Sequence, residues 1–253
     1  FSISYSQSHT FNFANSPRNS RLTTFCFRAT YEGRRSFASK SPTKHRRREI
    51  IPAQVIVTHK WSKITDQDQP GVEVVDTTSK AADWRRDLSP FHLGPCTMYN
   101  GIVSQNMENA WQFAKVYSED TDAQGNPTKG YWAWARLGWA DTTPHRYPKG
   151  KGRAPEYSLW DGQQLGYIDA RKQIYGPLYA EAVQATEGYQ TLVDIYENSQ
   201  KLYLRDWDGW NMTKHGMSSY TDVLNNPQRK MGHAFVLAML LTQDSALSQM
   251  ALR

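Results

Sequence analysis

Residues 104–119 read SQNMENAWQFAKVYSE, and this stretch decides the fold of the chain. Its apolar residues recur with the i, i+3, i+4, i+7 spacing of a helix that buries one face. They are Met107, Ala110, Trp111 and Ala114. Ser104 belongs to the residue types that cap helix N-termini. The pattern therefore predicts a half-buried helix over residues 105–119.

The polar side chains of this helix form a second stripe. Glu108, Gln112 and Lys115 stand at i, i+4 and i+7, so they share one face of the helix. Trp111 lies beside them. A carboxylate next to an indole suits a site that binds a flat ring and stabilises positive charge. By spacing alone, an ordinary solvent-facing stripe is the favoured interpretation.

The rest of the chain predicts a mainly helical α+β domain with a few short strands. Strand patterns occupy residues 54–58, 72–77 and 202–204, and helix patterns occupy residues 131–140, 161–198 and 227–241. Pro177 should kink or break the second of these helices, because proline removes a backbone donor and clashes with the preceding turn. Asn226 is the expected N-cap of the last helix.

A loop over residues 141–160 carries a further candidate site. Its segment 147–153 reads YPKGKGR, in which Lys149, Lys151 and Arg153 alternate with glycines that let a backbone approach an anion closely. The spacing of a P-loop is absent. A phosphate-binding loop and a mobile basic surface loop both fit this pattern.

The segment 206–210 reads DWDGW and follows a predicted strand. Asp206 and Asp208 flank Trp207, an arrangement that suits holding a sugar or activating water. Alternatively, the tryptophans belong to the core and the aspartates cap a turn. The sequence favours neither interpretation.

The net charge of +6 is concentrated at the N-terminus. Residues 1–50 hold 10 Lys or Arg against 2 Asp or Glu, so the other 203 residues hold 20 against 22. A domain that binds phosphate backbones should carry the basic surface itself, so nucleic acid is expected to bind through the extension only. The Ser- and Arg-rich composition of residues 1–50 is typical of a transit peptide or of a disordered basic tail. A transit peptide predicts a mitochondrial or plastid protein, and a tail predicts a cytoplasmic one.

Motifs of several common classes are missing from the sequence. The longest apolar run, residues 234–241, is far shorter than the roughly 20 residues of a membrane span, so we expect a soluble protein. No Cys/His spacing suggests zinc, and the two cysteines, Cys26 and Cys96, do not suggest a disulfide framework. Neither a G-x-S-x-G nor a G-x-G-x-x-G motif occurs.

Taken in order, several segments resemble the NADAR (YbiA-like) superfamily, over about residues 85–243. LSPF is similar to the family's opening S-x-F segment, MENAWQ to its helix with an essential glutamate, and DWDGW to its D-x-x-W-G element. These segments span residues 88–91, 107–112 and 206–210. Trp160 stands where the family has a tryptophan ahead of a long helix, and residues 226–241 resemble its closing helix. The likeness is strongest to an uncharacterised branch encoded by phages and large viruses.

The resemblance implies one YbiA-like domain over residues 51–253 that hydrolyses a C–N bond of a small ribosyl or ADP-ribosyl compound, without metal or redox cofactor. It implies that Glu108 is the first catalytic carboxylate and that Asp206 or Asp208 is the second. The implied substrate-binding residues are Trp111, Gln112, Lys115, Lys149, Lys151, Arg153, Trp160 and Trp207. Trp111 and Trp160 would stack on the base or ribose, and the three cations of the loop would hold phosphates.

Two interpretations from other classes stay open. The domain is a catalytically inactive binding or assembly module of the same fold, or the chain is an RNA-associated organellar protein that uses its basic extension. In an enzyme, Glu108, Trp160 and either Asp206 or Asp208 must converge on one concave pocket. In a module, these side chains should be scattered or the pocket should be filled.

Overall fold

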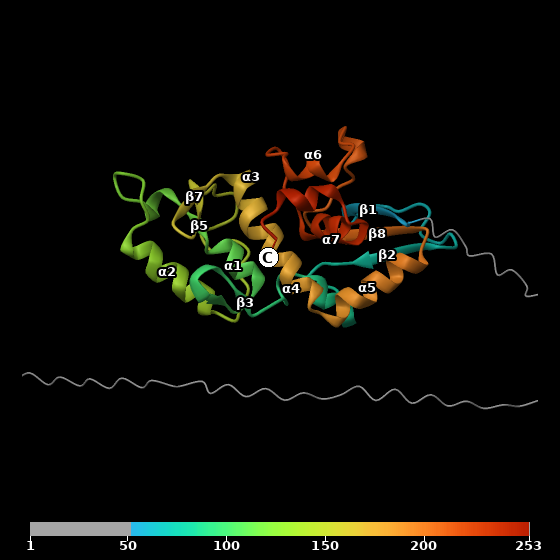
Figure 1. Cartoon of the computed structure of the whole chain (residues 1–253), viewed down its shortest axis with the longest axis horizontal. Coiled ribbons are helices and arrows are strands. Elements are labelled where there is room, and N and C mark those ends of the chain that lie inside the picture. The colour runs from blue at the N-terminus through green and yellow to red at the C-terminus, as the bar shows by residue number, and fades with distance from the viewer. Residues whose placement is uncertain (1–51, 253) are drawn as a thin grey trace, which may run out of the picture. The chain divides into compact units, whose positions relative to one another are not determined.

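The computed structural model describes residues 52–252 (Figure 1). The predicted basic extension, residues 1–50, lies outside the described residues. Of the described residues, 41% are helical and 16% are in strands, so the chain is a mixed α and β structure with more helix than strand. No helix among residues 52–252 has the length and apolar content needed to cross a membrane.

A three-stranded parallel sheet forms one part of the domain. Strand β8 (Lys201–Asp206) lies between β1 (Gln54–His59) and β2 (Val72–Asp76). Both pairings are parallel, with Lys201 opposite the first residue of each neighbour. All three strand predictions are confirmed. Because the strands are parallel, their carboxyl ends meet at one edge of the sheet.

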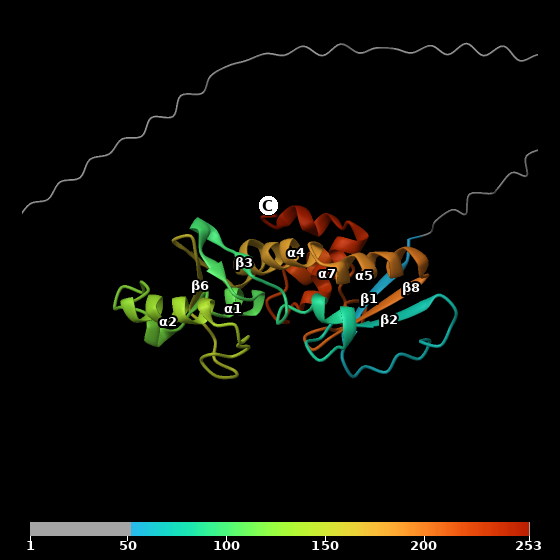
Figure 2. The same ribbon diagram turned by 90° about the horizontal axis from the view of Figure 1, so that it is seen from below.

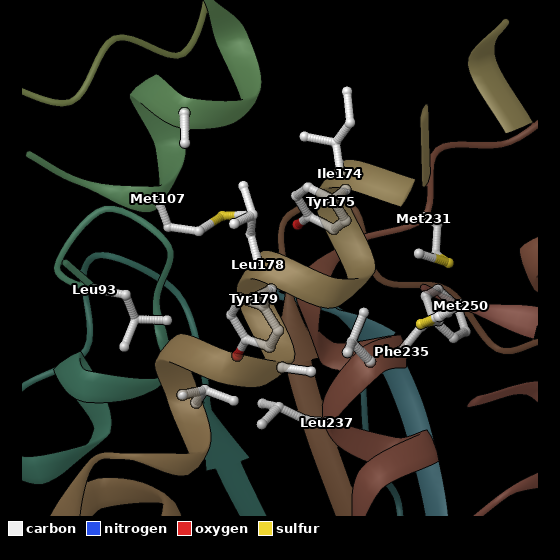
Figure 3. Packing of buried hydrophobic residues seen from close by; sticks show 14 of the residues in the cluster. Leu93, Met107, Ile174, Tyr175, Leu178, Tyr179, Met231, Phe235, Leu237 and Met250 are labelled. Carbon is white, nitrogen blue, oxygen red and sulfur yellow. The ribbon is translucent and has the colours of Figure 1, made fainter. Parts of the chain in front are cut away.

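Three helices build the core beside this sheet. Helix α4 (Gly176–Gln184) packs against both α5 (Glu187–Asn198) and α7 (His233–Thr242), and α7 packs against β1 and β8. Helix α7 is apolar around most of its circumference, as expected for a helix surrounded by protein. Figure 3 shows buried side chains that pack around α4 and α7, with labels on Leu93, Met107, Ile174, Tyr175, Leu178, Tyr179, Met231, Phe235, Leu237 and Met250.

The other part of the domain surrounds α1, and α4 lies between the two parts in both ribbon views (Figures 1 and 2). Its helices are α1 (Met107–Gln112) and α2 (Lys129–Ala140). An antiparallel pair is formed by β3 (Cys96–Thr97) and β4 (Val103–Ser104). An antiparallel sheet is formed by β5 (Lys115–Val116), β6 (Tyr157–Trp160) and β7 (Gln163–Leu165). Helix α2 confirms the prediction for residues 131–140 and begins two residues earlier.

The predicted helix over residues 105–119 is shorter than expected. It starts after Asn106, whose Oδ1 accepts a hydrogen bond of 2.8 Å from the backbone N–H of Asn109, so Ser104 is not the cap. It ends at Gln112 because the chain then pairs as β5 with β6. Pairing with a distant strand is a tertiary effect that helix periodicity cannot reveal.

The prediction of one long helical region over residues 161–198 is wrong in detail. After β7 come α3 (Tyr167–Ala170) and a π-helical turn (Arg171–Tyr175), which continue into α4. Pro177 directly follows the π-helical turn and does not break the helix, and the break before α5 comes later, at Thr186.

The last long helix begins at His233 and not at residue 227, with Gly232 as its N-cap. Gly232 has an extended backbone, and a Cβ there would come to 2.0 Å from Asp206 Oδ2. The close approach of this carboxylate therefore fixes where the helix starts. Sequence patterns did not predict α6 (Tyr220–Leu224) or the 3-10 turns Asp83–Leu88, Tyr99–Gly101, Ser118–Asp120, Thr213–His215 and Ser245–Gln249.

Candidate functional site

A pocket of about 540 Å³ lies where the two parts of the domain meet. Helix α1, the loop 146–156, the carboxyl end of β8 and the start of α7 contribute to its wall. The backbone N–H of Glu108 donates to Pro90 O at 3.0 Å, which joins α1 to the segment 89–91 that also lines the pocket. Ligands commonly bind at the carboxyl ends of parallel strands, and this pocket lies at that edge of the sheet.

Glu108 lies in the wall of this pocket and is buried, with 5% of its surface exposed. Its Oε1 accepts a hydrogen bond of 2.8 Å from Gln112 Nε2. Burial raises the pKa of the Glu108 carboxyl, against the hydrogen bond from Gln112 and the positive charges of Lys115 and Arg146. The interpretation of this face as an ordinary solvent-facing stripe is wrong, because the pocket and not bulk solvent lies in front of it.

Lys115 continues the same line of side chains. Its Nζ donates to Gln112 Oε1 at 2.6 Å and lies 4.7 Å from the centre of the Trp111 ring. Burial lowers the pKa of Lys115 to about 8, although the charge of Glu108 opposes this shift. Trp111 contacts Tyr175, with 5.2 Å between ring centres. The pocket thus holds an acid, an amide, an amine and two aromatic rings side by side.

Asp206 reaches the pocket from the end of β8 and is buried. Its Oδ1 accepts from the backbone N–H of Asp208 at 3.1 Å, and its Oδ2 accepts from the backbone N–H of Ala234 at 3.2 Å. His233 Nδ1 lies 3.3 Å from Oδ2, while His233 Nε2 donates to the carbonyl oxygen of Thr77 at 2.8 Å. Asp206 therefore holds the first turn of α7, as the turn-capping interpretation expects.

Asp208 differs from Asp206 in its surroundings, although both line the pocket. Its side chain is 31% exposed and pairs with Arg146, whose Nη2 donates to Oδ2 at 2.6 Å. Lys230 Nζ lies 3.8 Å from the other oxygen. Trp207, between the two aspartates, also lines the pocket. Both aspartates of the acidic-aromatic segment therefore reach the pocket, but Asp206 holds backbone groups and Asp208 pairs with cations.

Three of the predicted substrate-binding residues do not line this pocket. Trp160 is buried, and its ring packs against Tyr99 with 4.8 Å between ring centres. Lys149 donates to Asp120 Oδ1 at 2.8 Å. Lys151 is exposed on the loop. Trp160 and these two cations therefore lie outside the pocket wall, because core packing and a nearby carboxylate direct the first two elsewhere.

Arg153 lines the pocket, but its guanidinium is already occupied. Nη1 and Nη2 donate to the two carboxylate oxygens of Glu119 at 2.7 and 2.6 Å. A bidentate pair of this kind satisfies both the charge and the planar geometry of the guanidinium. Arg153 is thus placed near the site without being free to hold a phosphate.

Sequence reasoning missed four side chains of the site: Arg146, Tyr175, Lys230 and His233. Arg146 and Lys230 lie in loops, where no periodicity indicates direction. His233 follows Gly232, and a glycine before a helix is a weak signal of close packing. Among the described residues, no cluster of three or more His, Cys, Asp or Glu is arranged to hold a metal ion.

Comparison with known proteins places the site in a recognised sequence family. The model of a family of unknown function, DUF6939, matches residues 58–234. The matched segment includes every pocket residue described above. No curated protein and no solved structure matches the chain.

Proposed function

The chain belongs to DUF6939, a family of unknown function, and from its pocket we propose that it hydrolyses a C–N glycosidic bond of a ribosyl or ADP-ribosyl compound. The observation that carries this proposal is the buried Glu108 carboxylate, placed between aromatic rings and cations in one pocket. The order of segments that resembles the NADAR superfamily gives independent support.

Glu108 is the proposed catalytic carboxylate. Among residues 52–252, Gln112 is its one hydrogen-bond partner, which leaves Oε2 available to a ligand. When the base departs, ribose takes on oxocarbenium character, and a fixed carboxylate in a water-poor site stabilises that charge. A raised pKa also suits a group that accepts and returns a proton near neutral pH.

The reaction balances with this one carboxylate as proton carrier. Water adds its oxygen to C1 of ribose while the C1–N bond breaks and leaves its electron pair on nitrogen. One proton of the water passes to Glu108 and then to the departing nitrogen. The products are ribose or ADP-ribose with a free C1 hydroxyl and the neutral base.

The remaining pocket residues have binding roles in this proposal. Trp111 and Tyr175 offer flat surfaces for a base or a ribose ring. Arg146 and Lys230 replace Lys149, Lys151 and Arg153 as the phosphate ligands, because they line the pocket and share a single carboxylate. Asp208 orients these two cations, and Asp206 fixes the start of α7 against the pocket.

The test uses the full chain and a panel of possible substrates: nucleosides, ADP-ribosylated nucleobases, ADP-ribosylated nucleic acid and ADP-ribosylated protein. Released ribose or ADP-ribose is quantified by chromatography and mass spectrometry. Glu108→Gln should abolish release, and Glu73→Gln, which removes the same charge from an exposed position of β2, should not. If wild type releases no more sugar than Glu108→Gln from any substrate, the domain is a binding module without this activity.

A further inference from the structure

Trp61 is exposed to 73%, although an indole is among the largest apolar side chains. It follows β1 directly and lies against Trp207, which lines the pocket; 5.7 Å separate the ring centres and the rings meet at 75°. His59 also touches Trp207, with 6.2 Å between ring centres. An aromatic surface therefore continues from the pocket to its outer rim.

The main chain holds Trp61 in this position. The backbone N–H of Lys60 donates to Asp206 O at 2.9 Å, and that of Ser62 donates to His59 O at 2.9 Å. The side chain of Lys60 is bound by Asp76 at the end of β2. The turn is thus tied to all three strands of the sheet, so the backbone that carries the exposed ring is held in a defined place.

Cations lie next to this aromatic surface. Arg146 and Lys230 line the same pocket as Trp207 and contact the adjacent Asp208. One Nη2–H of Arg146 goes to that carboxylate, and the guanidinium has five N–H groups in all. Lys230 remains 60% exposed in its side chain. A phosphate can therefore bind between Glu108 and the aromatic rim.

We propose that Trp61 and Trp207 bind a second nucleobase of the ligand, which is joined through phosphate to the ribose that reacts at Glu108. This inference rests on the proposed function for the position of the ribose. Exposed indoles beside cations are the usual means of stacking a base without reading its identity. The second base is either the adenine of an ADP-ribosyl group or the base of the next residue in a nucleic acid strand.

The experiment measures binding and needs no turnover. ADP-ribose, ribose 5-phosphate and a five-residue single strand of deoxyadenosine are titrated by calorimetry against the full chain, carrying Glu108→Gln to prevent turnover. Trp61→Ala should weaken binding of ADP-ribose or of the oligonucleotide by about five- to a hundredfold. It should leave the affinity for ribose 5-phosphate unchanged. Trp61→Phe should restore most of the affinity, because it keeps a flat ring.

Leu137→Ala is the matched control, because Leu137 is exposed to 74% but lies on α2, outside the pocket. The ligand that responds to Trp61→Ala identifies the source of the base. The inference is overturned if Trp61→Ala changes the affinity for neither base-containing ligand. It is also overturned if neither of these ligands binds. If Trp61→Ala weakens binding of a base-containing ligand but the wild-type protein shows no glycosidase activity, the stacking site stands and only the proposed function is overturned.

Discussion

Helix α1 and the loop 147–153 both present charged side chains that the sequence predicts for a site, yet the structure uses them differently. Glu108 of α1 and Lys115 of the following strand β5 are linked through the amide of Gln112, and all three side chains line the pocket. In the loop, Lys149 and Arg153 are neutralised by carboxylates of the neighbouring 3-10 turn. Arg153 spends two donors on one bidentate pair, whereas Arg146 gives a single donor to Asp208 and keeps others for a ligand in the pocket.

The largest effect is expected on the α1 side of this comparison. Glu108→Gln should lower kcat by about a hundred- to a thousandfold, because it removes the charge that stabilises the transition state. KM should change far less, since that charge develops mainly in the transition state. The amide oxygen of Gln can still accept from Gln112, so the thermal midpoint should stay close to that of wild type. Steady-state kinetics and thermal unfolding measure both quantities.

Two results would contradict this expectation. Unchanged turnover would remove Glu108 from the mechanism. Loss of turnover together with a collapsed thermal midpoint would make Glu108 a structural residue, and the binding-module interpretation would then be favoured.

Asp206 and Asp208 sharpen the comparison, because the sequence makes them equivalent. Asp206→Ala leaves two backbone N–H groups and His233 without their buried partner, which should cost about 2–4 kcal/mol of the free energy of unfolding. Asp208→Ala removes ion pairs that are about one-third exposed and should cost less than about 1 kcal/mol. Urea unfolding of the two variants gives both values. Equal losses would show that the buried contacts of Asp206 do not stabilise α7.

Much of the fold could be predicted from sequence because it depends on local signals. Short apolar runs indicated β1, β2 and β8, the i, i+3, i+4 spacing indicated α1, and an aromatic-rich segment indicated α2. The early end of α1 and the late start of α7 could not be predicted in this way. The first depends on pairing with β6, and the second on the approach of Asp206 to Gly232.

The site was predictable where one helix carries it. Glu108 and Gln112 share a face of α1 by helix geometry, and Lys115 reaches the same line of side chains from β5. Arg146 and Lys230 come from loops far apart in sequence and meet at Asp208 and Tyr147. Trp160 illustrates the opposite error, because its ring packs against Tyr99 and lies outside the pocket wall, a tertiary contact that the sequence pattern does not reveal.

The buried amine of Lys115 should give stability a measurable pH dependence. Its pKa falls from 10.5 to about 8 in the folded chain, so between these values the unfolded chain holds a proton that the folded chain has lost. Stability should therefore rise with pH across this window, by on the order of 2 kcal/mol. Lys115→Met should lack this contribution, and Lys80→Met, at an exposed position, should retain it. Urea unfolding at several pH values from about 7.5 to about 10.5, a range that covers both pKa values, measures this slope. Equal slopes in wild type and Lys115→Met would contradict a buried amine.

The smallest effects are expected on the loop side of the comparison. Arg153 pairs with Glu119 at the surface, with side-chain exposures of 46% and 40%, and exposed pairs contribute less than about 1 kcal/mol. Lys151 is exposed and lies outside the pocket wall. Arg153→Gln and Lys151→Gln should therefore change the affinity for ADP-ribose by less than about twofold, whereas Arg146→Gln should weaken it by about tenfold or more, as for a lost charge-assisted hydrogen bond. Calorimetric titration of the three variants ranks them directly. If Arg153→Gln or Lys151→Gln weakens binding as much as Arg146→Gln does, the loop holds the phosphates after all, and Glu119 must release Arg153 when the ligand binds.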